Sequence, residues 1–413
     1  MKKHPLFKAS KIVGIVSIIL LFTQVSQAQI ITYEDSLNAG LTRTAQKTFV
    51  SSYGHVHAGY DLKKGKGTAN LDRIVLFLGH KFNKNITFFS EWELEDARVE
   101  GGSPKGEFSI EQCFLKLNVN PNYYFTAGLF IPRIGIINEN HLPTTFSSNS
   151  RPMVEILVIP ATWREIGVGF YGSPRSIPGF NFSLGVVNGL SSQGFEHGTG
   201  LREGRFEGQN ATATNLAVTG SILQYIKNWR VQVSGYYGGT AGLAKRQSDS
   251  LQLDRGFFGT AVGLGEANVQ YLGKWVYAKA LGSIITIPKA SNINRAYANN
   301  TAQLMYGAYA EVGYNLMHIF NKPERNLTIY GRYEKLDLNA KMSNNGIRDA
   351  QYNQAYLVAG LNYSPIKGVI LKFDYTHRIT GTPSPALLIN PFPTAPPYYN
   401  SNGFVNLGMG YSF

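Results

Sequence analysis

The chain consists of short segments in which apolar and polar residues alternate. The lengths of the connections between these segments most constrain the fold. The segments are about ten residues long, and their period of two indicates β-strands whose faces meet different surroundings. Turn residues join them at seven short connections: 83–85, 120–122, 173–179, 227–228, 273–274, 321–325 and 364–367. Longer polar stretches alternate with these turns: 63–70, 97–106, 132–161, 188–212, 239–256, 287–300, 336–352 and 380–401. The pattern predicts about 16 antiparallel strands.

This sorting of connections is typical of bacterial β-barrels, which keep short turns on the periplasmic side and long loops outside. After residue 28, no apolar run approaches the roughly 20 residues that a membrane helix needs. A closed barrel is then the structure that satisfies backbone hydrogen bonds in lipid. The 24 Tyr, 24 Phe and 44 Gly residues suit strands, turns and crowded walls. We predict an all-β fold, a transmembrane antiparallel β-barrel with short periplasmic turns and long extracellular loops.

The N-terminus has the layout of a secretory signal peptide. A basic start is followed by the apolar run "IVGIVSIILLF" and by "TQVSQA", which ends in small residues. We expect cleavage after Ala28, a short periplasmic lead-in over 29–48 and the barrel over 49–413. Cys113 is the only cysteine, which excludes an intrachain disulfide framework and a zinc site of the cysteine type.

The C-terminal segment "GFVNLGMGYSF" (403–413) has the alternation of a closing strand. Its apolar positions are Val405, Leu407, Met409, Tyr411 and Phe413, and small or polar residues lie between them. A terminal phenylalanine on such a strand resembles the usual outer-membrane insertion signal. We therefore predict that Tyr411 and Phe413 form this signal and that the protein resides in the outer membrane of a Gram-negative-type bacterium.

Charge narrows the range of partners. The signal peptide carries four lysines and no acidic residue, so its removal lowers the formal net charge from +13 to +9. This excess favours small anionic or polar solutes and the phosphates of outer-membrane lipid and lipopolysaccharide. The basic residues are scattered along the chain rather than clustered, which argues against nucleic-acid binding. No cofactor is expected.

Strand parity divides the charged residues between the two faces of the wall. The basic residues predicted to line the lumen are Arg230, Arg332, Lys372 and Arg378, with Lys279 and Arg73 on strands of ambiguous parity. The predicted acidic ones are Glu91, Glu93, Glu95, Glu165, Glu334 and Asp374. Because the glutamates concentrate on one strand and the bases lie on later strands, opposing acidic and basic walls are one hypothesis. Ordinary solvated lumen residues are the other.

The connection 132–161 is the longest loop and is unusually apolar for an external loop. It contains Ile134, Ile136, Ile137, Phe146, Met153, Ile156, Leu157 and Val158. These side chains suit a loop that folds into the barrel, where Arg133, Glu139, Arg151 and Glu155 would line a constriction. A loop packed between subunits would have the same composition, so both positions stay open.

The stretch "GLFIPRIGIINENHLPTTFSSNSRPMVEILVIPATWREIGVGFYG" (128–172) resembles porins of the phosphate-selective porin O and P family. The resemblance implies a 16-stranded homotrimeric channel with infolded loops, passive diffusion and anion preference. The family's selectivity rests on an arginine ladder and a lysine cluster, whereas the lumen charges expected here are mixed. A mixed wall does not select phosphate over other anions, so the specificity is not carried over.

Other functions have weaker support in the sequence. His55 and His57 share a strand face as a possible metal pair, but no third ligand is identifiable, and we expect no metal site. His141 with Ser147 and Ser148 lacks an orienting partner, and we expect no enzyme. The long loops 191–214 and 381–402 suit a surface role. A closed outer-membrane barrel that acts as a binding or adhesion protein is the alternative to an open porin.

Overall fold

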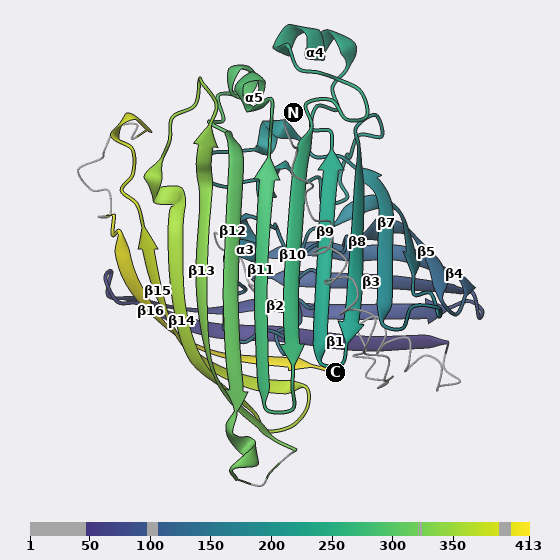
Figure 1. The fold of residues 1–413 in the computed structure, drawn as a ribbon, viewed down its shortest axis with the longest axis vertical. Coiled ribbons are helices and arrows are strands. Elements are labelled where there is room, and N and C mark those ends of the chain that lie inside the picture. The colour runs from purple at the N-terminus through teal and green to yellow at the C-terminus, as the bar shows by residue number, and fades with distance from the viewer. Residues whose placement is uncertain (1–46, 97–105, 321, 323, 388–397) are drawn as a thin grey trace, which may run out of the picture.

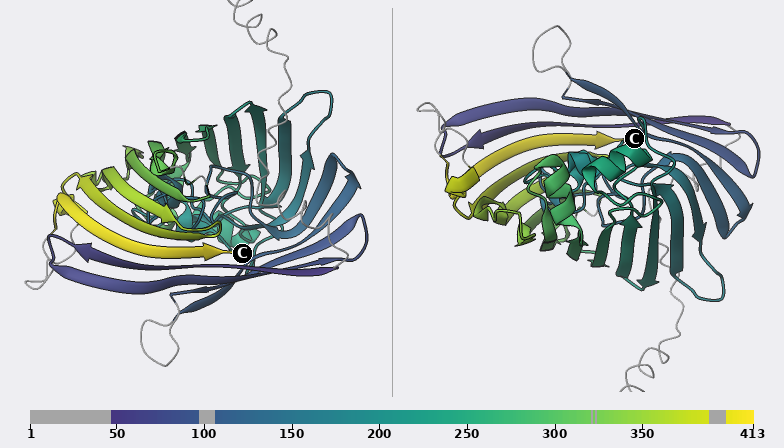
Figure 2. Two further views of the ribbon diagram at one scale, coloured as in Figure 1. Left: turned by 90° about the horizontal axis from the view of Figure 1, so that it is seen from below. Right: turned by 90° about the horizontal axis from the view of Figure 1, so that it is seen from above.

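The protein is a closed barrel of sixteen antiparallel strands, in which each strand pairs with its neighbours in sequence and β1 pairs with β16. Figures 1 and 2 show this continuous wall in a computed structural model. The structure describes residues 47–96, 106–320, 322, 324–387 and 398–413. The predicted signal peptide over 1–28 and nearly all of the lead-in lie outside the described residues. The predicted fold class is confirmed.

The strand bounds follow the alternating segments of the sequence. They are β1 (Thr48–Asp61), β2 (Lys66–Lys81), β3 (Ile86–Glu95), β4 (Glu107–Asn120), β5 (Tyr123–Phe130), β6 (Glu165–Gly172), β7 (Phe180–Asn188), β8 (Leu216–Ile226), β9 (Trp229–Gly238), β10 (Val262–Leu272), β11 (Val276–Thr286), β12 (Ala302–Asn315), β13 (Asn326–Met342), β14 (Asn353–Ser364), β15 (Val369–Thr380) and β16 (Ser401–Ser412).

Short helices lie in the connections. They are α3 (Val154–Leu157), α4 (Lys245–Leu251), α5 (Ala290–Tyr297), η1 (Ser192–Gly194), η2 (Arg202–Gly204), η3 (Leu316–His318), η4 (Ala350–Tyr352) and η5 (Pro385–Leu387). In Figure 1, α4 and α5 lie at one end of the barrel, opposite the short turns after β8 and β10. Among the described residues, none of the helices is both long and apolar enough to cross a membrane.

Two predicted loops are shorter than the sequence indicated. The predicted loop 63–70 is a tight turn, because β1 ends at Asp61 and β2 begins at Lys66. The predicted loop 336–352 begins later, because β13 continues to Met342. In both places polar residues extend the hydrogen-bonded ladder, and a ladder needs backbone pairing rather than apolar side chains. Composition therefore underestimated the length of these strands.

The two faces of the wall differ in chemistry. Large apolar side chains are exposed on fifteen of the sixteen strands, for example Val233 at 57% and Phe373 at 45%. Strand β10 is the exception, since Gly263, Gly265 and Ala267 occupy outward positions there. The inward positions carry buried polar and charged residues together with aromatic and aliphatic ones. The core of the protein therefore lies inside the barrel.

The last strand closes the barrel with its final residue in the ladder. Tyr53 pairs with Ser412 and Asp61 with Phe404 across the β1–β16 seam. The Phe413 backbone N–H donates to the Ser52 carbonyl at 2.9 Å, and the Ser52 N–H donates to the Phe413 carbonyl at 3.1 Å. The Phe413 side chain is 78% exposed. Its ring is thus available for contacts outside the chain.

Candidate functional site: the barrel interior

The segment between β5 and β6, residues 131–164, lies inside the barrel, and we call it the infolded loop (Figure 2). Its side chains and backbone bond to inward side chains of β3, β9, β12, β13 and β15. Strands from all around the wall therefore contact one segment. The loop covers the inner wall of its own chain rather than the face of another subunit.

Apolar packing fixes the infolded loop against one part of the wall. Ile134, Val154, Val158 and Ile159 are fully buried. They belong to a single apolar cluster with inward residues of the strands, including Phe77, Phe89, Leu281, Ile285 and Leu336. Burying one large aliphatic or aromatic side chain stabilises a protein by about 1.5–3 kcal/mol. This gain accounts for the unusual apolar content of the loop.

Glu155 of α3 organises the backbone of the loop. Its carboxylate accepts hydrogen bonds from the N–H groups of Ile136 and Ile137, both at 2.7 Å. The Tyr309 hydroxyl of β12 donates to the other carboxylate oxygen at 2.6 Å. Burial raises the pKa of Glu155 to about 7, although all three hydrogen bonds act to lower it.

Glu139 forms an ion-pair clamp between the loop and β9. Its two carboxylate oxygens bind Arg133 of the same loop and Arg230 of β9. The guanidinium of Arg133 also lies over the Tyr171 ring, 5.6 Å from its centroid. Burial alone would raise the pKa of Glu139, but the two arginines outweigh burial and lower it. Glu139 therefore pairs with two arginines near the beginning of the infolded loop.

A buried acidic cluster anchors the loop on the side of β3 and β4. His141 Nε2 lies 3.2 Å from Glu91 Oε1 and 3.7 Å from Glu111 Oε2. The Tyr53 hydroxyl donates to the same two carboxylates, at 2.8 and 3.1 Å. Thr162, near the end of the loop, donates to Glu111 at 2.6 Å. This cluster joins β1, β3 and β4 to His141 in the first half of the loop and to Thr162 near its end.

A β-bulge brings Glu111 into this cluster. Glu91 pairs with Gln112 and Trp92 with Ile110, so Glu111 is the extra residue on β4. A bulge turns one additional side chain toward the same face. Glu111 was not among the predicted lumen residues, although the sequence carries a signal of the bulge. The outward apolar positions change phase from Phe108 and Ile110 to Cys113, Leu115 and Leu117.

Acidic and basic side chains also form ion pairs on the opposite side of the wall, on β11, β12 and β13. Arg332 on β13 binds Glu311 on β12 at 3.0 Å and Glu334 at 2.8 Å. Lys279 of β11 lies 4.0 Å from Glu311. Ser147 of the loop donates to Glu311 at 2.8 Å. Each basic residue here therefore lies beside an acid.

Strand β15 holds the middle of the loop by two inward side chains. Lys372 donates to the Ser148 carbonyl at 2.9 Å and lies over the Phe146 ring, 3.8 Å from its centroid. The Asp374 carboxylate accepts from the backbone and side-chain nitrogens of Asn149, at 2.8 and 2.7 Å. Lys372 is only 2% exposed. Its charge is therefore used for anchoring the loop.

The remaining predicted site residues lie at separate places. Arg73 binds Glu93 at 2.9 Å and Glu95 at 3.2 Å. Glu165 accepts from Trp163 Nε1 at 2.6 Å and from Asn188 at 2.5 Å. Arg378 lies against the Phe404 ring. Arg151 has one buried guanidinium nitrogen without a hydrogen-bond partner.

One sequence hypothesis does not hold in this geometry. The acids of β3 lie beside Arg73, and the bases of β13 lie beside Glu311, so both sides of the wall carry both signs. Separate acidic and basic walls are therefore a wrong prediction. His141 contacts Glu91, whereas Ser147 contacts Tyr277 and Glu311 on the other side. These residues form no nucleophile–base pair.

Comparison by sequence finds a distant relative but no family. No protein-family model matches the chain. An uncharacterized protein of Aquifex aeolicus (strain VF5) is 28% identical over 353 residues, which cover 82% of this chain and 79% of that protein. These sequence relationships do not establish a family.

Solved structures with a similar fold are outer-membrane proteins. A loop L8 deletion mutant of OmpT, an outer membrane protein of Vibrio cholerae, matches with a TM-score of 0.51 at 10% identity, over 89% of this chain and 100% of that one. The anion-selective porin from Comamonas acidovorans matches at 0.50 and 11%, over 89% and 99%. Salmonella typhi OmpF in complex with daunomycin matches at 0.52 and 13%, over 89% and 97%. The chain therefore has the closed β-barrel fold of outer-membrane porins.

Proposed function

We propose that this protein is an outer-membrane porin, a water-filled channel for passive diffusion of small polar solutes. The supporting observation is a sixteen-strand wall with an apolar exterior and a charged interior into which one long loop folds. A barrel of this strand number is too wide for its own wall side chains to fill. The infolded loop would supply the constriction, lined by Arg133, Glu139 and Arg151. Glu155, which the sequence also placed there, is fully buried and holds the loop backbone instead. No enzymatic activity is proposed.

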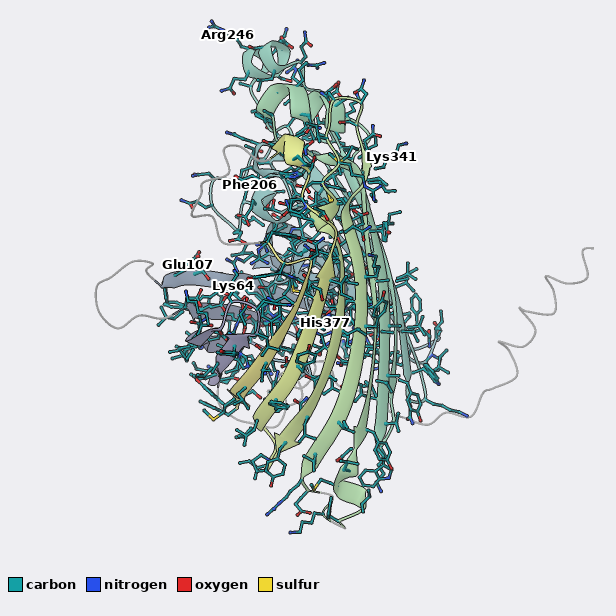
Figure 3. The ribbon with its side chains drawn as sticks, turned by 90° about the vertical axis from the view of Figure 1, so that its left-hand side faces the viewer. Lys64, Glu107, Phe206, Arg246, Lys341 and His377 are labelled. Carbon is teal, nitrogen blue, oxygen red and sulfur yellow. The ribbon has the colours of Figure 1, made fainter. Side chains whose placement is uncertain are left out.

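The apolar outer face of the barrel supports a location of the protein in the outer membrane. Exposed apolar side chains all around the barrel far exceed the patches that soluble monomers carry. The predicted signal peptide would deliver the chain to the periplasm. Lys64, Arg246 and Lys341 are exposed. In Figure 3, Arg246 and Lys341 lie toward the end that carries α4, whereas Lys64 lies at mid-height on one side. They would bind phosphates of lipopolysaccharide.

A modest preference for anions, including phosphate-like ones, is the second part of the proposal. Its support is the basic set on the inner wall together with the resemblance of 128–172 to the phosphate-selective porin O and P family. The ion pairs of Arg73, Arg230 and Arg332 with acids limit the preference. Strict phosphate selectivity would need bases without acidic partners. The proposed homotrimer rests on the same resemblance.

A closed barrel with a surface-binding role is the second candidate. The observation that favours it is the low exposure of inner charges, 5% for Arg332 and 2% for Lys372. Charges covered by the infolded loop contribute less to a water-filled path than free ones. The exposed long connections would then form the functional surface.

Single-channel conductance in a planar bilayer tests the proposal. The refolded full-length mature chain is added to one side, and the reversal potential is measured under a KCl gradient. Steady current steps with an anion-selective reversal potential are the expected result. Steps without selectivity would retain the porin and remove the anion preference. No steps from protein with a native heat-shift on gels would overturn the porin in favour of the closed barrel.

A further inference from the structure

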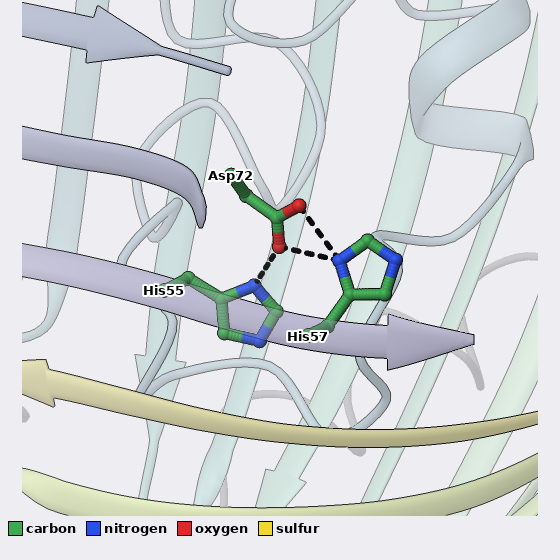
Figure 4. A group of neighbouring side chains, drawn as sticks. All are labelled: His55, His57 and Asp72. Atoms are coloured by element: carbon green, nitrogen blue, oxygen red, sulfur yellow. Dashed lines mark hydrogen bonds and ion pairs between the residues drawn. The ribbon is translucent and has the colours of Figure 1, made fainter. Parts of the chain in front are cut away.

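A β-bulge on β2 creates a cluster of three potential metal ligands on the inner wall. His55 pairs with Arg73 and Val56 with Leu71, so Asp72 is the extra residue. Strict alternation would turn Asp72 away from the inward-facing Arg73. The bulge instead turns it toward the two histidines of β1 (Figure 4). The bulge therefore supplies Asp72 as the third ligand, which could not be identified from the sequence pattern.

The ligand atoms of this cluster converge. Asp72 Oδ2 lies 2.5 Å from His55 Nδ1 and 2.7 Å from His57 Nδ1. All three ligand atoms lie within 4.8 Å of one another. Figure 4 shows both Nδ1 atoms directed at one carboxylate. Asp72 thus contacts both rings, and one ion placed among these atoms would reach all three residues.

One residue of the cluster is buried, and the other two are partly exposed to solvent. The His55 side chain is 4% exposed, and its Nε2 atom has no hydrogen-bond partner. The side chains of His57 and Asp72 are 25% and 18% exposed. Solvent therefore reaches the side of the cluster where an ion would enter.

We propose that His55, His57 and Asp72 bind a divalent transition-metal ion of the Zn²⁺ class. Imidazole nitrogen and carboxylate oxygen are preferred zinc ligands, at about 2.0–2.2 Å. In tetrahedral coordination these atoms lie about 3.3 Å apart, so small side-chain rotations would open the present contacts to admit the ion. Solvent would fill the fourth position. The bound ion would add positive charge to the inner wall.

The buried acidic cluster is a poorer candidate. Glu91, Glu111 and His141 also bring three ligand atoms together, but all three are buried. Their atoms already accept from or contact Tyr53, Gln112 and Thr162. An ion there would have to displace these bonds and pass the infolded loop. The satisfied hydrogen bonds indicate an anchoring role instead.

Metal titration of the refolded, untagged full-length mature chain tests the site. Calorimetry with Zn²⁺ alone is expected to show one ion per chain. The absorption spectrum with Co²⁺ in place of Zn²⁺ should show the intense bands of low-coordinate cobalt with nitrogen ligands. His57→Ala and Asp72→Asn should each weaken binding at least tenfold. Asp72→Asn retains the size of the side chain, and native heat-shift on gels verifies folding.

His197→Ala is the matched control. His197 Nε2 lies 3.2 Å from Asp349 Oδ2, which makes a His–Asp pair without a second histidine. This variant should bind Zn²⁺ with unchanged affinity. The proposal is overturned if the parent chain binds no stoichiometric Zn²⁺. It is equally overturned if folded His57→Ala and Asp72→Asn bind as the parent does, or if His197→Ala loses binding to the same extent. None of these readouts depends on channel activity.

Discussion

The Tyr309 hydroxyl on β12 donates a 2.6 Å hydrogen bond to Glu155 on α3 of the infolded loop. This contact joins the loop to the wall at a fully buried carboxylate. Since the same carboxylate also accepts from two backbone N–H groups of the loop, its protonation state affects both the loop fold and its docking.

Docking of the infolded loop should weaken as pH rises. The pKa of Glu155 in the folded protein, about 7, is above its ordinary value of 4.5, so the folded state binds the proton more tightly. The resulting stabilisation is fully present below pH 4.5 and is lost as pH rises through 7. Its size is about 3 kcal/mol by linkage. Acrylamide quenching of Trp163, in a background without other tryptophans, measures loop opening against pH.

Glu155→Gln serves as the partner experiment, because glutamine imitates the protonated acid. Loop opening in this variant should depend less on pH between 5 and 8 than in the parent. A pH dependence equal to that of the parent would show that another group controls docking.

Neutralising Glu139 should release the loop at β9. Glu139→Gln leaves Arg133 and Arg230 in a mostly buried place without their shared acid. Removing one member of such a group should destabilise docking by about 2–4 kcal/mol. The uncompensated charge should also shift the reversal potential toward anions.

A double variant separates the effect of the uncompensated charge from the effect of losing the ion-pair contacts of Glu139. Adding Arg133→Gln to Glu139→Gln restores the formal charge, so the reversal potential should return toward that of the parent. If Glu139→Gln changes neither quenching of Trp163 nor reversal potential, the clamp has no part in docking.

Gly307 should be intolerant of a side chain, because the loop packs directly on it. A Cβ atom there would lie 2.9 Å from Val154 Cγ1 and 3.0 Å from Val158 Cγ2. Gly307→Ala should push α3 away from β12, at a cost of about 1–3 kcal/mol, and increase current noise. Gly282→Ala is the control, since a Cβ atom at Gly282 meets nothing within 4 Å. Equal noise in both variants would contradict this packing role.

Phe413 should matter for assembly more than for stability. Its ring is 78% exposed and stacks on Tyr411, while its backbone completes the ladder with Ser52. Phe413→Ala should reduce the folded protein in outer-membrane fractions severalfold. The same variant refolded in detergent should match the parent within about 0.5 kcal/mol. Met409→Ala, on the same outward row, is the control for simple loss of apolar surface. Equal losses in both variants would argue against a specific terminal signal.

The local pattern of the sequence accounts for much of the wall. A period of two is a property of each strand by itself, so Leu371, Phe373, Lys372 and Asp374 can be assigned to faces without knowing their neighbours. Polar strand ends at 66–70 and 336–342 were missed, because pairing with a neighbour rather than local composition makes them strands.

The contacts of the candidate site depend on pairs of residues far apart in the chain. The apolar content of 132–161 favoured a buried loop, but its partners Tyr309, Glu311 and Asp374 follow more than 140 residues later. No local pattern relates such positions. The inward glutamates were identified, whereas their pairing with Arg73 and His141 was not.

The sequence by itself therefore determined a sixteen-strand closed wall, because alternation and turn residues act over neighbouring positions. The tertiary structure decided what the interior contains. Register shifts between paired strands turned Asp72 and Glu111 inward. A register shift is a relation between two strands, so one strand's sequence shows only a change of phase and not the partner that the turned side chain will meet.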